Sequence, residues 1–178
     1  MSKKTIWITG GSTGIGKALA IKFASKGWNV VISARRTELL NELSNSYENI
    51  SGFPLDVTNK EKCKEVFNEI KNKFENIDIC FFSTGTWDPK KEKEIDVEQM
   101  EDVFKVNFFG TVNCIKAVEQ YFRDKKKGTI AHILSMAGYS GMPFLTAYSS
   151  SKAALAVMIK NVANSVSGHQ IRVNGDNF

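Results

Sequence analysis

Short apolar runs alternate along the chain with longer stretches in which apolar residues recur every three or four positions. The runs predict strands, because a parallel strand covered on both faces is apolar at nearly every position. They fall at residues 6–8, 30–32, 50–55, 77–82, 130–134 and 170–174. The longer stretches predict helices after the first run and then at 37–47, from 58 or 59 to 74, at 97–122 and at 147–166. This alternation, without repeats or linkers, predicts an α/β fold with one doubly wound parallel sheet of six strands.

Several helices carry signals for their buried face or their first residue. The first helix has apolar residues four positions apart, which predict the face that it buries: Ile15, Leu19 and Phe23. The hydroxyl of Thr37 is predicted to cap the second helix, and either Thr58 or Asn59 is predicted to cap the third. The helix at 97–122 is apolar on more than one face, which favours contact with more than one neighbour.

A glycine-rich turn joins the first strand to the first helix. Gly10, Gly14 and Gly16 are spaced Gly-x-x-x-Gly-x-Gly, unlike the usual dinucleotide fingerprint Gly-x-Gly-x-x-Gly. A turn without Cβ atoms lets a phosphate approach the backbone, and the free N–H groups at a helix start favour a negative ligand. We therefore expect the turn to bind the phosphates of a nucleotide in a Rossmann-like domain. A purely structural turn is the alternative.

The end of the second strand carries positive charge. Ala34 is followed by Arg35 and Arg36, where an NAD-binding domain commonly has an acidic residue that binds the ribose hydroxyls. Guanidinium groups instead pair well with a 2′-phosphate. The sequence therefore favours NADP over NAD, with the alternative that one arginine simply begins the next helix.

Tyr148 and Lys152 are four residues apart, so on a helix they share one face. The same face continues through apolar residues and is predicted to point into the core, where a lysine needs a partner or a ligand. A nearby ammonium favours the ionised form of a phenol, and such a tyrosine can exchange a proton with a substrate oxygen. Ser135 follows the fifth strand and can hold that oxygen. A structural use of the Tyr-x-x-x-Lys pair is the alternative.

Composition narrows the classes of function. The 178 residues carry a net charge of +5, but the lysines are spread among glutamates, so we expect no nucleic-acid-binding face. Cys63, Cys80 and Cys114 lack the spacing of metal ligands and are predicted to be buried thiols without a metal. We see no signal peptide and no apolar run long enough to span a membrane, and we expect a cytoplasmic protein.

Together these residues resemble the classical short-chain dehydrogenases/reductases, from about residue 4 to residue 174. Residues 9–16 are similar to the family's Thr-Gly-x-x-x-Gly-x-Gly cofactor motif. Ser135, Tyr148 and Lys152 are similar to its catalytic serine, tyrosine and lysine. Asn107 resembles the family asparagine that kinks the long helix and holds a water next to the lysine.

The resemblance implies an oxidoreductase that transfers hydride between a nicotinamide and a ketone or secondary alcohol. Tyr148 is implied as the acid/base, and Ser135 as the residue that orients the carbonyl. Lys152 is implied to bind the nicotinamide ribose and lower the tyrosine pKa, while Asn107 carries a proton relay. The predicted cofactor-binding residues are Gly10, Ser12, Thr13, Gly14, Ile15, Gly16, Arg35, Arg36, Asp56, Val57, Ser83, Gly85, Tyr148 and Lys152.

Two stretches depart from the family pattern. Residues 82–85 read Phe-Ser-Thr-Gly where the family usually has Asn-Asn-Ala-Gly, although Ser83 can still form hydrogen bonds. After residues 171–174, family members continue with a Pro-Gly turn, a segment that covers the substrate and a further strand, whereas this chain stops at Phe178. We therefore expect a single domain over residues 1–178 that is truncated at its C-terminus. A non-catalytic NADP-binding protein is the alternative function.

Apolar residues after the fourth and fifth strands predict a hydrophobic substrate pocket. Its predicted lining is Trp87, Met136, Met142 and Phe144. The substrate would be a small carbonyl or alcohol compound with apolar surroundings, with packing of the loop or a subunit contact as the alternative. Residues 88–94 are expected to form a mobile surface loop, and the apolar surfaces of the last two long helices predict a homodimer or homotetramer.

Overall fold

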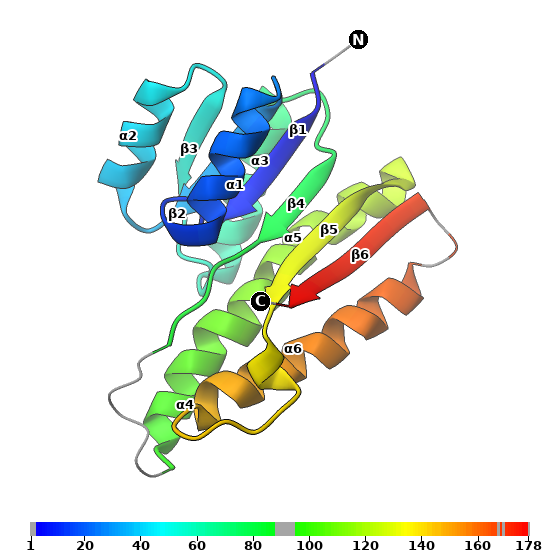
Figure 1. Cartoon of the computed structure of the whole chain (residues 1–178). Helices are drawn as coiled ribbons and strands as arrows, with labels where there is room; N and C mark the ends of the chain where they lie inside the picture. Colours follow the sequence, from blue (N-terminus) through cyan, green and yellow to red (C-terminus); the bar gives the residue numbers. More distant parts are fainter. Residues whose placement is uncertain (1–2, 88–94, 167, 169, 178) are drawn as a thin grey trace.

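The computed structural model describes residues 3–87, 95–166, 168 and 170–177, and its centre is a six-stranded parallel sheet (Figure 1). The strands stand in the order β3-β2-β1-β4-β5-β6. Their bounds are β1 Thr5–Thr9, β2 Asn29–Ala34, β3 Ile50–Pro54, β4 Ile79–Phe82, β5 Lys127–Leu134 and β6 Gln170–Asn177. The order reverses between β1 and β4, as in Rossmann folds, which confirms the predicted doubly wound sheet.

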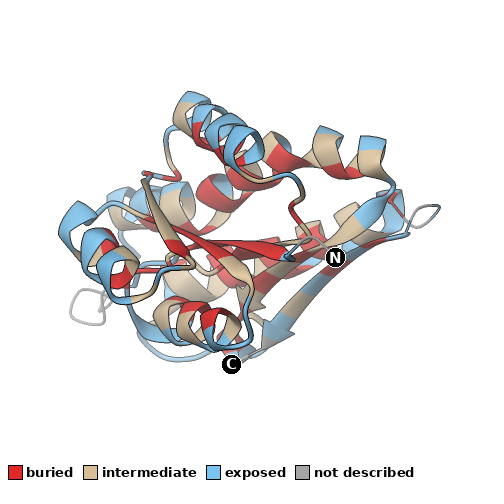
Figure 2. Ribbon diagram, turned by 90° about the horizontal axis from the view of Figure 1, so that it is seen from above, coloured by how far each residue is buried: buried red, intermediate tan, exposed pale blue. Residues whose placement is uncertain are grey.

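Helices cover both faces of the sheet. They are α1 Gly14–Ser25, α2 Thr37–Ser46, α3 Lys60–Lys73, α4 Val97–Phe104, α5 Gly110–Lys125 and α6 Thr146–Ser165, with a 3₁₀ turn at Met136–Gly138. Residues of β1 and β2 alternate between two cores: Trp7 and Val31 pack with α3, α5 and α6, whereas Ile6 and Val30 pack with α1 and α2. Figure 2 shows the buried residues concentrated in the sheet and on the helix sides that face it. The parallel strands are buried because both faces are covered.

The buried face of α1 differs from the prediction. Gly16, Ala20 and Ala24 face the sheet, while Ile15 is 46% exposed. Small residues let the helix axis approach the strands closely, so Leu19 and Phe23 pack only at the margin of this contact and remain partly exposed. The predicted stripe was therefore wrong by one position.

The caps at two helix starts are now defined. Asn59, not Thr58, caps α3, because its side chain accepts a hydrogen bond from the backbone N–H of Lys62. The predicted cap at Thr37 is wrong: Thr37 is the first residue inside α2, and Arg36 occupies the cap position without a side-chain hydrogen bond. The first N–H groups of α2 therefore have no side-chain cap.

The predicted helix at 97–122 is interrupted. A π-helical segment, Lys105–Phe109, separates α4 from α5 and places Asn107 in the interior. An inserted π turn shifts the register of a helix and often marks a functional position. One other bound also differs, because β6 continues beyond the predicted end at residue 174. The predicted mobile loop at 88–94 lies outside the described residues.

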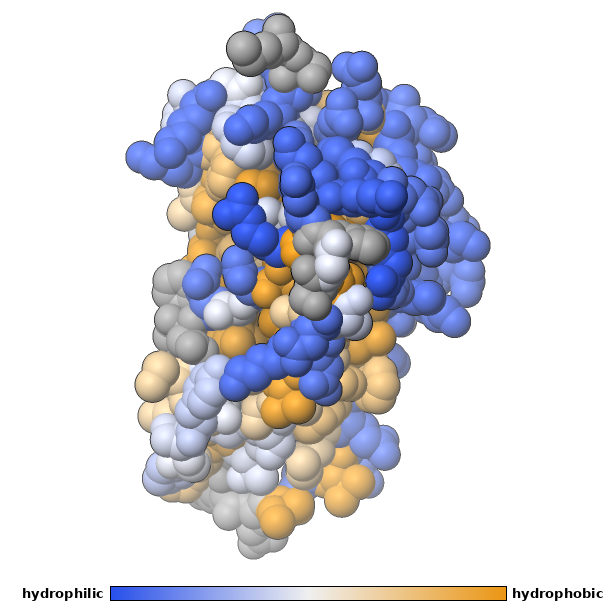
Figure 3. Space-filling view, turned by 90° about the vertical axis from the view of Figure 1, so that its right-hand side faces the viewer, coloured by the Kyte–Doolittle hydropathy of each residue, from blue (hydrophilic) through white to orange (hydrophobic). Residues whose placement is uncertain are grey.

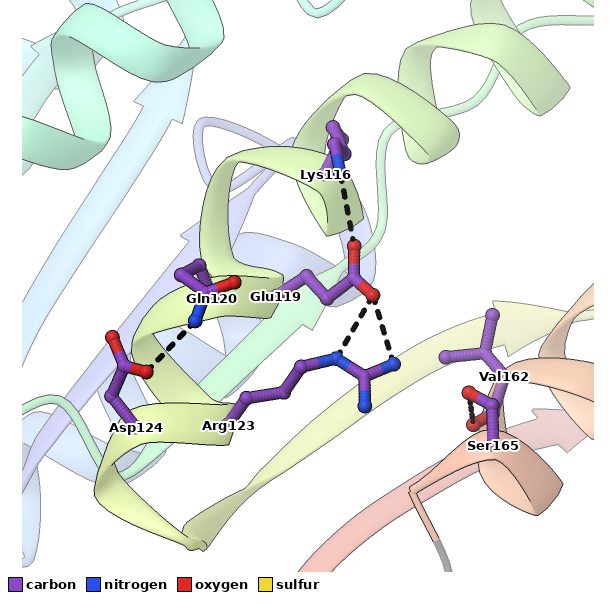
Figure 4. A network of polar contacts seen from close by, with 7 residues as sticks. All are labelled: Lys116, Glu119, Gln120, Arg123, Asp124, Val162 and Ser165. Carbon is purple, nitrogen blue, oxygen red and sulfur yellow. Dashed lines mark hydrogen bonds and ion pairs between the residues drawn. The ribbon is translucent and has the colours of Figure 1, made fainter.

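The outer side of α5 carries a ladder of charged side chains (Figure 4). Glu119 accepts hydrogen bonds from Arg123 and from Lys116, and Gln120 donates to Asp124 one turn further. The bonds from Arg123, followed by those from Lys116, lower the pKa of Glu119. Such pairs stabilise an exposed helix only modestly, by about 0.2–0.5 kcal/mol each. They mark this side of α5 as facing water.

Candidate active site

A cleft of about 700 Å³ opens at the carboxyl ends of the strands, where β1 and β4 lie side by side. This is the point at which open α/β sheets bind their ligands. The cleft combines residues from the glycine turn, the end of β2, the loops after β3 and β4, and α6. Its lining consists of Gly10, Ser12, Thr13, Gly14, Ile15, Gly16, Ala34, Arg35, Arg36, Leu55, Asp56, Val57, Ser83, Thr84, Gly85, Thr86, Trp87, Val106, Ile133, Tyr148 and Lys152.

The glycine turn is built for close approach. Gly10 has φ +69°, a left-handed conformation that favours glycine, and its N–H donates to the carbonyl of Ser33. A Cβ on Gly16 would lie 2.7 Å from Ser83 Oγ, so α1 begins directly against the end of β4. Thr13, the N-cap of α1, forms no side-chain cap bond. The N–H groups of the first turn of α1 therefore fit an anionic group such as a pyrophosphate.

Positive charge borders the cleft beside the glycine turn. Arg36 Nη2 donates to Thr13 Oγ1 at 3.1 Å, which ties the end of β2 to the glycine turn. Burial works to raise the pKa of Asp56, but hydrogen bonds from Thr58 and the charges of Arg35 and Lys105 lower it overall. Asp56 is therefore an anion fixed beside the exposed arginines, and this end of the cleft offers both a cation and hydrogen-bond acceptors.

Tyr148 and Lys152 both line the cleft from the first turns of α6. Lys152 is only 3% exposed, and its Nζ donates to the carbonyl of Ile133 at 2.8 Å. Burial lowers the pKa of Lys152 to about 8. Its ammonium lies 5.8 Å from the centre of the Tyr148 ring, and the Trp87 ring lies 6.2 Å from the same ring, centre to centre. The predicted pair therefore lines the same cleft as the glycine turn.

Asn107 is fully buried and joins the π turn to the rest of the site. Its Oδ1 accepts from the N–H of Thr86 at 2.7 Å, and its Nδ2 donates to the carbonyl of Thr86 at 3.0 Å. The same Nδ2 donates to Ser151 Oγ at 3.2 Å, and Ser151 donates to the carbonyl of Tyr148. Asn107 thus fixes the loop after β4 against the turn of α6 that carries the tyrosine.

Sequence reasoning missed the two partners of Asn107. Ser151 stands directly before Lys152 and is fully buried, but a serine within a helix gives no signal of its own in a sequence. Thr86 participates through backbone groups, which any residue type carries. Only the position of Thr86 just after β4, at the ligand-binding edge, could have indicated its role.

Five predicted residues do not line the cleft: Asn107, which lies behind it, together with Ser135, Met136, Met142 and Phe144. Ser135 is buried at the end of β5, where its Oγ accepts from the N–H of Ala137 at 3.3 Å and caps the 3₁₀ turn. Met136, Met142 and Phe144 are exposed on the following loop. Of the predicted pocket residues, Trp87 alone belongs to the cleft lining.

The model of the family described as short chain dehydrogenase matches residues 4–176. The chain belongs to this family. It is 31% identical over 175 residues to the 3-oxoacyl-[acyl-carrier-protein] reductase FabG of Thermotoga maritima, covering 96% of this chain and 71% of that protein. It is 32% identical over 181 residues to the dehydrogenase/reductase SDR family protein 7-like of Dictyostelium discoideum, covering 96% of this chain and 57% of that one.

Solved structures of short-chain dehydrogenases have the same fold. ElxO with NADP bound superposes with a TM-score of 0.92 at 31% identity, over 98% of this chain and 72% of ElxO. Serine dehydrogenase from Escherichia coli gives a TM-score of 0.90 at 26% identity, over 96% and 80% of the two chains. The protein is thus an oxidoreductase of a family that uses nicotinamide cofactors and acts on small molecules.

None of the helices within the described ranges is both long and apolar enough to cross a membrane. The described part of the chain also contains no cluster of three His, Cys, Asp or Glu side chains that could hold a metal ion. Cys63, Cys80 and Cys114 are free and buried, as predicted.

Proposed function

We propose that this short-chain dehydrogenase catalyses reversible hydride transfer between NADP and the carbonyl or alcohol carbon of a small apolar substrate. The observation that carries this proposal is that Tyr148 and Lys152 line the same cleft as the glycine turn. A nucleotide spanning that cleft would have its phosphates on the start of α1 and its reactive ring beside the phenol. The cofactor fit rests on the close backbone approach at Gly16 and the uncapped first turn of α1.

The bound nicotinamide supplies or accepts the hydride, and the residues of the chain handle the proton and the geometry. Tyr148 exchanges a proton with the substrate oxygen. Lys152 is mostly charged at pH 7, since its pKa of about 8 lies above that pH, and its ammonium lies 5.8 Å from the centre of the Tyr148 ring. Asn107 holds the loop and helix turn in place beside the lysine, and the proton would reach solvent through Lys152 and water.

The substrate end of the site is proposed to be apolar. Trp87 lies beside Tyr148, where its indole would contact a substrate bound to the phenol. Met136, Met142 and Phe144 follow Ser135 on an exposed loop and would cover the substrate if this loop moved toward the cleft. Ser135 would then turn its hydroxyl from the N–H of Ala137 to the substrate oxygen.

Replacement of Tyr148 by phenylalanine tests the assigned acid/base. Tyr148→Phe removes the proton donor and keeps the ring, so kcat should fall by about 100-fold or more while NADPH affinity changes little. The measurement is the loss of reduced-nicotinamide absorbance over a panel of hydrophobic ketones. Tyr47→Phe, at the end of α2 and outside the cleft lining, is the control and should retain full activity. Equal rates in wild type and Tyr148→Phe would refute the role, and NADPH binding without any turnover would favour the non-catalytic alternative.

NADP preference is proposed to depend on Arg35. The arginine lines the cleft at the end of β2, where a 2′-phosphate would be paired by its guanidinium. Arg35→Asp should shift the ratio of NADP to NAD affinity toward NAD by about 10-fold or more, because a carboxylate repels the phosphate and accepts ribose hydroxyls. Calorimetric titration with both cofactors measures it. Lys64→Asp on the exposed side of α3 changes the net charge equally and should leave the ratio unchanged.

A further inference from the structure

A histidine that has no part in the proposed reaction lies buried behind the site. His132 is fully buried in β5, and both of its ring nitrogens face polar atoms. Nδ1 contacts the carbonyl oxygen of Phe82 in β4, and Nε2 lies 3.5 Å from Thr111 Oγ1 in α5. Burying an imidazole without partners is costly, so these contacts explain how the core tolerates the ring.

The contacts define which ring nitrogen carries the proton. A carbonyl oxygen can only accept, so Nδ1 is the donor to Phe82. Burial, followed by the charge of Lys152, lowers the pKa of His132 to about 3, which keeps the ring neutral at physiological pH. Nε2 is then a bare acceptor that faces the hydroxyl of Thr111.

Thr111 connects the histidine to the π turn. Its hydroxyl donates to the backbone carbonyl of Asn107 at 3.0 Å and has His132 Nε2 as a second, more distant acceptor. A hydroxyl has one proton, so the two acceptors share a single donor. The position of the Thr111 hydroxyl is therefore restrained from both sides, by the π turn and by the imidazole.

The three segments that meet at His132 all continue into the cleft. Phe82 directly precedes the cleft residues that begin with Ser83. Ile133, the next residue of β5, accepts the hydrogen bond from Lys152. Thr111 stands one turn after Asn107, whose side chain holds the loop after β4 and the helix turn of Tyr148. A shift at His132 would thus displace the backbone acceptor of the lysine together with the π turn.

We propose that His132, as the neutral tautomer protonated on Nδ1, is a positioning residue that acts with Thr111. The pair, called here the His132–Thr111 link, fixes the end of β4 and the carbonyl of Asn107 relative to the backbone that holds Lys152. The link touches neither substrate nor cofactor. The predicted effect of the link on catalysis rests on the proposed function. Its hydrogen bonds can be tested whether or not the protein has that function.

The test removes one hydrogen-bonding group of the link at a time. Thr111→Val keeps the shape of the side chain and removes the hydroxyl, and Thr111→Ser keeps the hydroxyl. His132→Asn retains an amide donor near Nδ1 and loses the acceptor at Nε2. Steady-state kinetics with NADPH and an accepted ketone give kcat and KM, calorimetry gives NADPH affinity, and ring ¹⁵N chemical shifts report the His132 tautomer.

Thr111→Val and His132→Asn should each lower kcat by about 10-fold, with KM and NADPH affinity within about twofold of wild type, because small displacements of positioned groups slow the chemical step. Thr111→Ser should restore kcat. The double variant should be no slower than the slower single one, because both changes break one link. Equal losses in Thr111→Ser and Thr111→Val, or fully additive losses, would assign the residues to packing alone and overturn the proposal.

The ¹⁵N spectrum keeps this proposal separate from the proposed function. Wild type should show Nδ1 protonated and Nε2 unprotonated, and Thr111→Val should move the Nε2 resonance. If no ketone is reduced, the proposed function fails while the spectrum still decides the link. A ring protonated on Nε2 in wild type, or an Nε2 resonance unchanged in Thr111→Val, would overturn the link whatever the activity.

Discussion

Lys152 combines deep burial with a single neutral acceptor, the carbonyl of Ile133. Burial lowers the pKa of Lys152 from 10.5 to about 8. The folded protein therefore holds a positive charge beside Tyr148 at a cost to stability. At the residue scale, keeping this ammonium buried lowers the free energy of unfolding.

The lowered pKa of Lys152 predicts how stability depends on pH. Between pH 8 and pH 10.5 the unfolded chain keeps the proton that the folded chain has released, so the free energy of unfolding rises with pH over this window. Full release would add about 3 kcal/mol, at about 1.36 kcal/mol per pKa unit. Denaturant unfolding of wild type and Lys152→Met at several pH values measures the difference. A difference that stays constant from pH 8 to pH 10.5 would contradict the prediction.

Residue patterns predicted some members of the site and missed others. Spacing alone placed Tyr148 and Lys152 on one face of a helix, and the structure has both on the cleft. The structure gives the hydroxyl of Ser135 a local partner, the N–H of Ala137, because a serine just before a short helical turn can cap it. The His132–Thr111 link could not be read from sequence, because its members come from β5 and α5 and meet only through the tertiary fold.

Single elements show where pattern reading succeeds and where it fails. All six strands lie close to the predicted positions, because a strand covered on both faces is a continuous apolar run that is easy to find in the sequence. The buried side of α1 was predicted wrongly, because hydrophobic spacing favours large residues, whereas the contact with the sheet needs small ones such as Gly16 and Ala20. The π turn before α5 was not found from periodicity, because the helix at 97–122 is apolar on more than one face and a register shift within it is hard to detect; the resemblance of Asn107 was the one signal for it.

One methyl group added to Gly16, at the start of α1, should reduce both stability and cofactor binding. In Gly16→Ala the new Cβ would collide with the backbone of Gly10 and with Ser83 Oγ, which forces β4 and α1 apart. We expect a loss of about 1–3 kcal/mol in stability and a clear loss of NADPH affinity. Thermal unfolding and calorimetry measure both. Gly141→Ala is the matched control, because its Cβ would meet no atom within 4 Å. Unchanged NADPH binding in Gly16→Ala would mean that the turn does not hold the phosphates.

At the scale of the whole molecule, apolar side chains remain uncovered on the long helices. Val157 on α6 is 58% exposed, and Phe109 at the start of α5 is also exposed. In Figure 3, hydrophobic residues are more frequent in the lower half of the face shown, the half that contains α4 and the start of α6 in Figure 1. Contiguous exposed apolar surface is typical of a subunit contact. We propose that the chain forms a homodimer or homotetramer through α5 and α6.

Val157→Glu tests this assembly. A carboxylate buried against a second subunit loses its hydration, so the variant should be smaller than wild type in solution. Light scattering coupled to size-exclusion chromatography gives the mass of each. Asn45→Glu on the exposed side of α2 adds the same charge and should leave the assembly intact. A monomeric wild type, or an unchanged mass for Val157→Glu, would exclude this surface.

The pairing of β1 with β4 has a consequence for how the molecule acquires its cleft. The backbone N–H of Thr5 bonds the side chain of Asp78, 73 residues later, whereas β1, β2 and β3 are joined by much shorter connections. Closing so long a loop is entropically unfavourable and slow. The cleft therefore forms only after β1 has paired with β4. A dinucleotide seated there would recognise the finished protein alone, and it would prolong the lifetime of that state rather than hasten its formation.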